Sequence, residues 1–167
     1  SSRYIRRLAV PVPTFDEFVN RAQAQGKEVI PFRLPMQSDF NLDIKAFIGH
    51  VKSCGANSAL LIRPNNPTGS YLSKGDLTYF LDNMGSLDLV LVDESFIDFV
   101  DAEPDPSALS LISKYPNLII LKSLSKNYGI PGIRLGYAAT GNGERLAALR
   151  SDLPIWNINS QAQFFLE

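Results

Sequence analysis

The sequence is poor in residues that several common kinds of site require. It has 1 Cys and 1 His among 167 residues. One cysteine excludes an internal disulfide framework, and Cys54 therefore suits a reducing compartment. One histidine leaves zinc or Ser-His-Asp chemistry almost nothing to draw on, so we expect no metal. His50 falls on the polar side of an expected helix, which favours a surface position.

An excess of one charge and long apolar stretches are also missing. Sixteen basic residues against 17 acidic ones give a net charge of −1. This balance argues against nucleic acid as a partner, so any anion site must be local. No apolar stretch approaches the roughly 20 residues that cross a bilayer, and no signal peptide opens the chain. We therefore expect a cytoplasmic protein without a membrane partner.

What the sequence does contain is a series of apolar runs that alternate with helical patterns. Runs such as ALLI, LVLV and LIIL do not alternate with polar residues, which indicates strands covered on both faces. This order predicts an α/β fold with a largely parallel sheet flanked by helices. The expected strands cover residues 8–10, 29–34, 59–62, 89–92, 118–121 and 135–139, and the expected helices begin near residues 14, 44, 73, 143 and 156.

Two of the expected helices open with a capping signal. Thr14-x-x-Glu17 has the pattern of a capping box, in which the hydroxyl at the first position accepts from the backbone of the first turn. Ser73-x-x-Asp76 starts another helix in the same way. We expect Thr14 and Ser73 to cap their helices.

Polar segments directly follow three of the apolar runs. RPNNPTG (63–69) follows ALLI, DESF (93–96) follows LVLV, and KSLSK (122–126) follows LIIL. In open α/β sheets, ligands bind beyond the carboxyl ends of the strands. One rim of the sheet is therefore expected to present Asn66, Asp93 and Lys126 together.

The segment after Lys126 must fold back if it contributes to the same site. The eight residues from Lys126 to Arg134 would span about 26 Å if extended, too far for one small molecule. Gly129 and Gly132 permit the backbone to reverse, and Pro131 fixes one φ angle in the turn. We therefore expect Arg134 to return towards the end of the preceding strand.

The side chains gathered there have the chemistry of a phosphate site. The hydroxyls of Ser123 and Ser125 and the guanidinium of Arg134 can all donate to a phosphate, and arginine keeps its charge. A lysine beside a bound phosphate, with a carboxylate and an amide opposite, suits Schiff-base chemistry on a phosphorylated aldehyde.

As an ordered set, RPNNPTG, LVDESF and SLSK with an arginine eight residues later resemble the fold type I, aspartate aminotransferase-like (class I/II), pyridoxal-phosphate-dependent enzymes. The most similar branch contains histidinol-phosphate aminotransferase and threonine-phosphate decarboxylase. The resemblance runs from PVPTF (11–15) to WNIN (156–159). It implies that residues 1–167 are the central part of the cofactor-binding large domain, without the N-terminal segment and C-terminal small domain of the family. It also implies a homodimer.

The resemblance assigns the chemistry to three residues. Lys126 would form a Schiff base with pyridoxal 5′-phosphate and move the substrate α-proton. Asp93 would keep the pyridine nitrogen protonated, and Asn66 would donate to the phenolic oxygen of the cofactor. Many members carry a tyrosine three residues after the aspartate, where this chain has Phe96, so one hydrogen bond to that oxygen is lost.

The resemblance assigns cofactor binding to four further residues. Ser123 and Arg134 would hold the phosphate, with Ser125 as a third donor, and Phe15 would stack on the pyridine ring. Structural alternatives exist, since Phe15 could belong to the core and Ser125 could be a local cap. Ser123-x-x-Lys126 also matches the β-lactamase signature, but its S-D-N and K-T-G companions are absent.

Three functions remain open on this basis. The first is an aminotransferase acting on a small amino acid, with a phosphorylated one as an option. The second is a decarboxylase of an amino-acid phosphate, which DESFIDF with Phe96 resembles equally well. The third is a non-catalytic pyridoxal-phosphate-binding regulatory domain. We expect residues 1–167 alone to bind the cofactor weakly.

Overall fold

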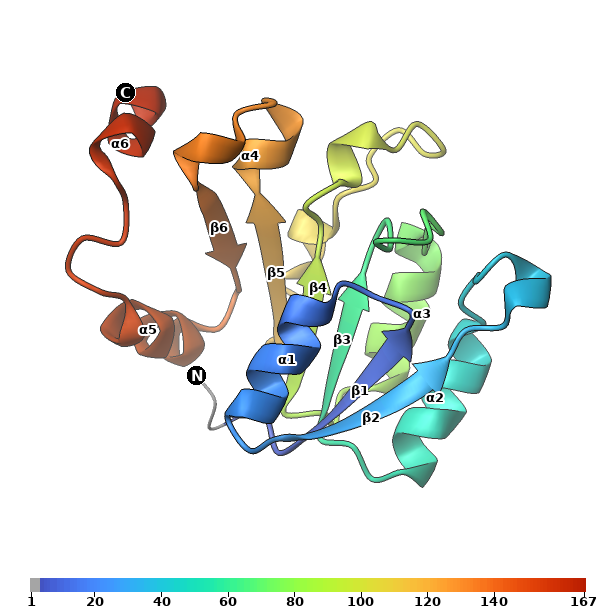
Figure 1. Ribbon diagram of the computed structural model, residues 1–167. Helices are drawn as coiled ribbons and strands as arrows, with labels where there is room; N and C mark the ends of the chain where they lie inside the picture. Colours follow the sequence, from blue (N-terminus) through green and yellow to red (C-terminus); the bar gives the residue numbers. More distant parts are fainter. Residues whose placement is uncertain (1–3) are drawn as a thin grey trace.

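The computed structural model describes residues 4–167 and contains one sheet of six strands (Figure 1). Their order is β2-β1-β3-β4-β5-β6, and every neighbouring pair is parallel except β5 with β6. This confirms the α/β fold with a largely parallel sheet. The strands are β1 (Arg7–Val12), β2 (Glu28–Arg33), β3 (Ser58–Ile62), β4 (Leu89–Asp93), β5 (Leu118–Ser123) and β6 (Gly136–Ala139).

Helices cover both faces of the sheet (Figure 1). The larger core lies between the sheet and the pair α2 and α3, where the rings of Phe47 and Phe80 stack 5.5 Å apart. On the other face, Ala22 of α1 packs with Leu8 and Leu60 of the strands. The helices are α1 (Asp16–Ala24), α2 (Ile44–Ser53), α3 (Lys74–Asn83), α4 (Leu124–Asn127), α5 (Gly143–Asp152) and α6 (Ser160–Leu166), with short 3-10 helices η2 (Met36–Ser38), η3 (Ile97–Phe99), η4 (Ala108–Leu111) and η5 (Pro131–Ile133).

One of the two capping predictions is confirmed and the other is wrong. Ser73 caps α3, because its Oγ accepts from the backbone N–H of Asp76 at 3.0 Å. At α1 the N-cap residue is Phe15, and no side chain caps the helix. Thr14 is buried and donates its hydroxyl to Asn65 Oδ1 at 3.2 Å. The hydroxyl of Thr14 therefore bonds to a residue of a neighbouring loop, and not to the backbone of α1.

The imidazole of His50 is half-buried, which corrects the expectation of a surface histidine. Its ring lies 5.2 Å from the ring of Phe32 and is stacked on that of Phe47. Nε2 is buried and has no hydrogen-bond partner among residues 4–167. The aromatic neighbours offer apolar contact, so this histidine contributes to the edge of the larger core.

The C-terminal segment differs in part from the expectation. The last helix begins at Ser160 and not near residue 156, and the side chains of Ile155 and Trp156 are both 91% exposed. The strand expected at 135–139 is present as β6, and it runs antiparallel to β5. Within the described part of the chain, no helix has the length and apolar character to cross a membrane.

Candidate active site

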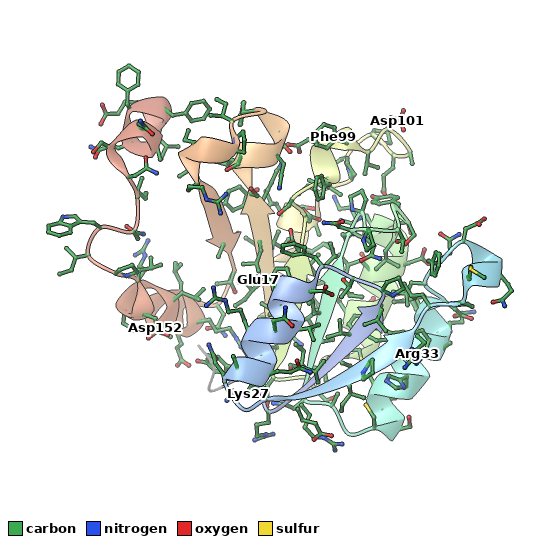
Figure 2. The ribbon with its side chains drawn as sticks, in the orientation of Figure 1. Glu17, Lys27, Arg33, Phe99, Asp101 and Asp152 are labelled. Carbon is green, nitrogen blue, oxygen red and sulfur yellow. The ribbon has the colours of Figure 1, made fainter. Side chains whose placement is uncertain are left out.

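The carboxyl ends of β3, β4 and β5 lie at the same edge of the sheet (Figure 1). Ile62 is in register with Asp93, and Asp93 is in register with Leu121. The loop that carries Asn66 therefore starts beside Asp93, while Lys126 lies in the short helix that follows β5. The structure brings the three predicted loops to one rim. Figure 2 places Phe99 and Asp101, which belong to the connection after β4, at this same end.

Asp93 is the buried acid of this rim. Its side chain is largely enclosed, and Oδ1 accepts from the backbone N–H of Ser95 at 2.8 Å. The hydroxyl of Ser95 in turn accepts from the N–H of Ser123 at 3.1 Å. Asp93 and Ser123 both line a cavity of about 610 Å³, together with Phe18 of α1 and Leu146 of α5. The carboxylate and the serine are thus fixed beside one volume.

Lys126 is the exposed amine of the rim. Its Nζ lies 5.8 Å from the ring centroid of Phe96, a cation–π contact. Among residues 4–167 no carboxylate forms an ion pair with it. Phe96 therefore offers Lys126 an aromatic face where a tyrosine would add a hydroxyl. An amine without an anionic partner is available for covalent chemistry.

The return of Arg134 towards Ser123 is explained by the β5–β6 pair. Ser123 is opposite Gly136, and the backbone N–H of Leu124 donates to Leu135 O at 3.0 Å. Arg134 immediately precedes this bonded segment. Its guanidinium has one intrachain hydrogen bond, from Nη1 to a backbone carbonyl at 3.3 Å, and no carboxylate partner in the described chain.

The backbone reversal within this loop is only partly the expected one. Gly129 has φ +62°, as a reversal requires, whereas Gly132 lies in η5 and has no positive φ. Arg134 itself takes the left-handed conformation, with φ 54° and ψ 37°. A residue with a Cβ pays roughly 1–2 kcal/mol for this conformation. Strain of this kind gathers at functional sites.

Ser125 and Phe15 differ in how well their surroundings suit a ligand. Ser125 is buried, and its Oγ lies 3.5 Å from Leu135 O, which favours a local structural role. Phe15 is 47% exposed, and its ring meets that of Phe18 edge-on at 6.2 Å. This exposure argues against the core alternative and leaves Phe15 able to stack on a ligand.

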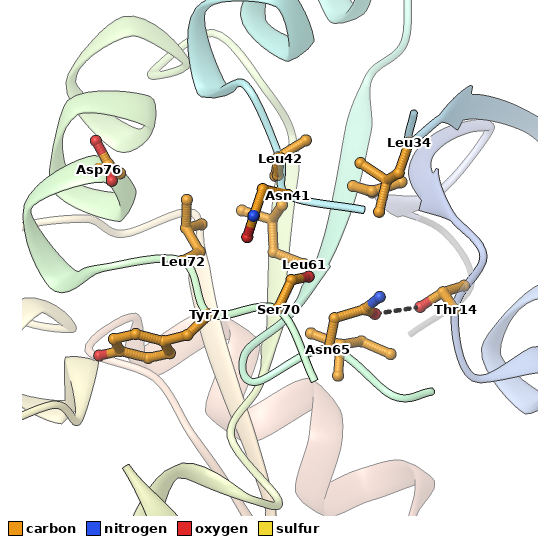
Figure 3. Close-up of a pocket in the computed structure, with 12 residues that line it drawn as sticks. Thr14, Leu34, Asn41, Leu42, Leu61, Asn65, Ser70, Tyr71, Leu72 and Asp76 are labelled. Carbon is orange, nitrogen blue, oxygen red and sulfur yellow. Dashed lines mark hydrogen bonds between the residues drawn. The ribbon is translucent and has the colours of Figure 1, made fainter. Parts of the chain in front are cut away.

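A second, smaller pocket shows how two of the loops are tied together (Figure 3). It measures about 110 Å³, and the hydrogen bond from Thr14 to Asn65 crosses one side of it. The amide of Asn65 also donates to Pro13 O at 2.9 Å. These bonds join the segment that carries Phe15 to the loop that carries Asn66.

Sequence reasoning missed a buried ion pair directly behind the rim. Arg63 and Glu94 have fully buried side chains, and Arg63 Nη1 lies 2.5 Å from Glu94 Oε1. Tyr71, which accepts from Arg63, donates its own hydroxyl to Glu103. The pKa of Tyr71 is raised mainly by burial and next by its hydrogen bond to Glu103. The same hydrogen bond lowers the pKa of Glu103. The signal in the sequence was a charge placed directly after each of two buried runs.

The fold and the ordered rim define a family of enzymes. Residues 5–167 match the model of the family described as aminotransferase class I and II. The chain therefore belongs to this family, as the sequence motifs predicted. Pyridoxal 5′-phosphate is the cofactor of the family.

Several individual members of the family are similar to this chain. The chain is 40% identical over 173 residues to CMP-5′-(3-aminopropyl)phosphonate synthase of Streptomyces rubellomurinus, covering 99% of this chain and 27% of that protein. It is 35% identical to the L-serine phosphate decarboxylase of Sulfurospirillum multivorans, covering 97% and 42%. The histidinol-phosphate aminotransferase structure from Clostridium acetobutylicum has a TM-score of 0.85 at 28% identity, covering 96% and 47%. The chain thus spans less than half the length of these relatives.

The residues present fit the cofactor of the family. A buried carboxylate suits a protonated pyridine nitrogen, and the unpaired amine of Lys126 suits an aldehyde. Ser123, the last residue of β5, and the guanidinium of Arg134, which precedes β6, suit a phosphate dianion. The cavity of about 610 Å³ beside Asp93 and Ser123 has room for an aromatic ring.

Proposed function

We propose that the full-length protein is a pyridoxal-phosphate-dependent enzyme acting on a small amino acid, and that residues 1–167 form the central part of its large domain. The observation that supports this most is the common rim, where the carboxylate of Asp93 ends β4 and the unpaired amine of Lys126 follows the neighbouring strand β5. The bound cofactor supplies an electron-withdrawing ring. Asp93 would hold a proton on the ring nitrogen, Asn66 would donate to the phenolic oxygen, and Lys126 Nζ would move a proton at the substrate α-carbon.

The remaining residues of the proposed site bind and orient the cofactor. Ser123 and Arg134 donate to the phosphate, and Ser125 stays a proposed third donor despite its buried hydroxyl. Phe15 covers one face of the ring. The N–H of Ser95 donates to Asp93 Oδ1 at 2.8 Å and fixes the orientation of this enclosed carboxylate. Asp93 at the ring nitrogen and Ser123 with Arg134 at the phosphate would together fix one orientation of the cofactor ring.

The lysine can be tested by spectroscopy on the full-length protein. The Lys126→Ala variant should lose the visible absorbance of the lysine-bound cofactor, because the proposal assigns that amine to Lys126. Lys114→Ala is the matched control, since Lys114 pairs with Asp82 at the opposite end of the sheet. An unchanged spectrum in Lys126→Ala would refute the assignment.

For the reaction, we propose decarboxylation of a small phosphorylated amino acid. Relatives named L-serine phosphate decarboxylase are 31% and 35% identical to this chain and support this choice, as does Phe96 in place of tyrosine. Transamination is the second candidate, supported by the family itself and by the 28% identical histidinol-phosphate aminotransferase. With O-phospho-L-serine, release of carbon dioxide supports the first candidate, and keto-acid formation with an amino acceptor supports the second.

We also propose that the full-length protein is a homodimer. Large apolar side chains are exposed in and before α6, with Trp156 at 91% and Phe164 at 80%. Such side chains commonly mark an interface. Light scattering should give twice the monomer mass, and residues 1–167 alone should bind the cofactor weakly. A monomer that retains the cofactor and turns over substrate would contradict this proposal.

A further inference from the structure

Every nitrogen of the Arg63 guanidinium makes at least one hydrogen bond inside the protein. Nε donates to Leu72 O at 2.9 Å, and Nη2 donates to the hydroxyl of Tyr71 at 2.8 Å. Nη1 donates to Glu94 Oε1 at 2.5 Å and to Pro106 O at 2.9 Å. Arg63 starts the loop that contains Asn66, and Leu72 ends it. One buried side chain therefore closes this loop at both ends.

The carboxylate of Glu94 is equally well satisfied. Oε1 also accepts from the backbone N–H of Ala108 at 2.9 Å, and Oε2 accepts from the hydroxyl of Ser107 at 2.7 Å. The backbone N–H of Glu94 donates to Leu121 O at 2.8 Å. The residue thus joins the tip of β4 to β5 and to the start of η4. A buried charge is tolerated only with such complete partners.

The pair also reaches the backbone of Asp93. The N–H of Arg63 donates to Asp93 O at 2.9 Å, and Glu94 is its direct neighbour. Asp93 lines the cavity between the sheet and α1, whereas Ala108, which donates to Glu94, belongs to the core beside α2 and α3. Successive side chains of a strand point to opposite faces. Glu94 therefore anchors the strand tip from behind while Asp93 faces the cavity.

We propose that the Arg63–Glu94 pair is a positioning device that holds the Asn66 loop and the Asp93 strand tip at a fixed separation for the cofactor. The inference rests on the proposed function, because it gives the pair a role in binding pyridoxal phosphate. A purely stabilising role would not require charge, since apolar replacement of a buried ion pair is often neutral or stabilising. Positioning would require charged or polar groups, because apolar side chains cannot bond the backbone at Leu72 in one loop and at Pro106 and Ala108 in another.

The test uses the full-length protein and two variants of the pair. Glu94→Gln keeps the shape of the side chain and removes its charge, while the double variant Arg63→Met/Glu94→Leu replaces the pair with apolar side chains. We expect both to weaken pyridoxal phosphate binding by about tenfold and to shift the pH titration of the bound cofactor's absorbance. Cofactor affinity is measured by fluorescence titration of the apoprotein, and stability by thermal melting.

The matched control is Asn117, a buried residue at the amino end of β5. Its amide donates to Met84 O and to Leu87 O, both at 3.1 Å, far along the strand from the rim. Asn117→Ala should lower the melting temperature and leave cofactor affinity within about twofold of the wild type. If the double variant does not fold, Ser107→Ala tests the same idea, because it removes one donor to Glu94 and should weaken affinity several-fold.

The outcomes separate this inference from the proposed function. If wild-type protein binds the cofactor, and the foldable variants of the pair bind it equally well with the same absorbance titration, the pair is structural only and the inference is wrong. If wild-type protein shows no cofactor absorbance, or Lys126→Ala retains it, the proposed function fails first. Reduced affinity and a shifted titration, absent from Asn117→Ala, support positioning.

Discussion

The Gly136→Ala substitution should separate β6 from β5. Gly136 lies opposite Ser123, and a Cβ added to it would meet Lys122 O at 2.7 Å and Ser123 Cα at 3.4 Å. Both atoms belong to the backbone, so no rotamer change can relieve the contact. Ordinary contact begins at 3.4 Å, so the strands would have to separate by about 0.7 Å at this point.

The size of the effect follows from this overlap. Overpacking of this kind costs about 1–3 kcal/mol in the free energy of unfolding. For a chain of this length each kcal/mol lowers the melting temperature by about 2–4 °C, so we expect a loss of about 2–12 °C. The bond from Leu124 N to Leu135 O, at 3.0 Å, lies next to the disturbed pair. Arg134 would move with it, and cofactor affinity should fall as well.

The assay is thermal unfolding of wild type and variant, followed by cofactor titration. Gly49→Ala is the control, since Gly49 lies within α2 and an added Cβ there meets nothing within 4 Å. That change should raise stability by about 1 kcal/mol, because alanine is the better helix former. If Gly136→Ala had the melting temperature and the cofactor affinity of the wild type, the close approach of β5 and β6 would not be what positions Arg134.

Three further substitutions test separate contacts. Arg134→Gly should relieve the φ 54° backbone and raise the melting temperature while weakening cofactor binding; unchanged binding would remove the guanidinium from the phosphate site. Thr14→Val should cost about 0.5–1.5 kcal/mol in a denaturant melt, because the bond to Asn65 is lost; equal midpoints would contradict this. The Tyr115 hydroxyl lowers the pKa of Asp82 below 3.8, so the stability it adds is present above pH 3.8 and is lost as pH falls through the folded-state pKa. Tyr115→Phe should raise the pKa of Asp82 in an NMR titration. The variant should be less stable than the wild type above pH 3.8 and equally stable in acid, where Asp82 is protonated in both. A stability difference that persists in acid would disprove the linkage.

The architecture was predictable because the strands are apolar on both faces. The runs at 59–62, 89–92 and 118–121 correspond to β3, β4 and β5 within one or two residues. Parallel strands bring their carboxyl ends to one edge, so the grouping of the three loops followed from their order alone. The direction of β6 did not follow, since a four-residue strand carries no signal for its partner.

Capping and reversal were predicted less well because both depend on tertiary neighbours. Thr14 has the spacing of a capping residue, but Asn65 offers its side chain a bond between loops. Gly132 looked suited to the second reversal, whereas Arg134 adopts the left-handed conformation. Local sequence favours one arrangement in each case, and a contact from a distant segment selects another.

The buried pair was missed because charge in a sequence is normally taken to indicate exposure. The two acids at the end of β4 have opposite environments, since Asp93 lines a cavity and Glu94 has a fully buried side chain behind it. Residue type and order therefore suffice to propose the groups that would touch the cofactor. Arg63 and Glu94 belong to the quoted segments RPNNPTG and LVDESF, but the bonds they make inside the protein do not follow from residue type, and the close approach at Gly136 lies outside those segments. It follows that a relative could keep every group proposed to touch the cofactor and still lose the cofactor, if these supporting contacts changed.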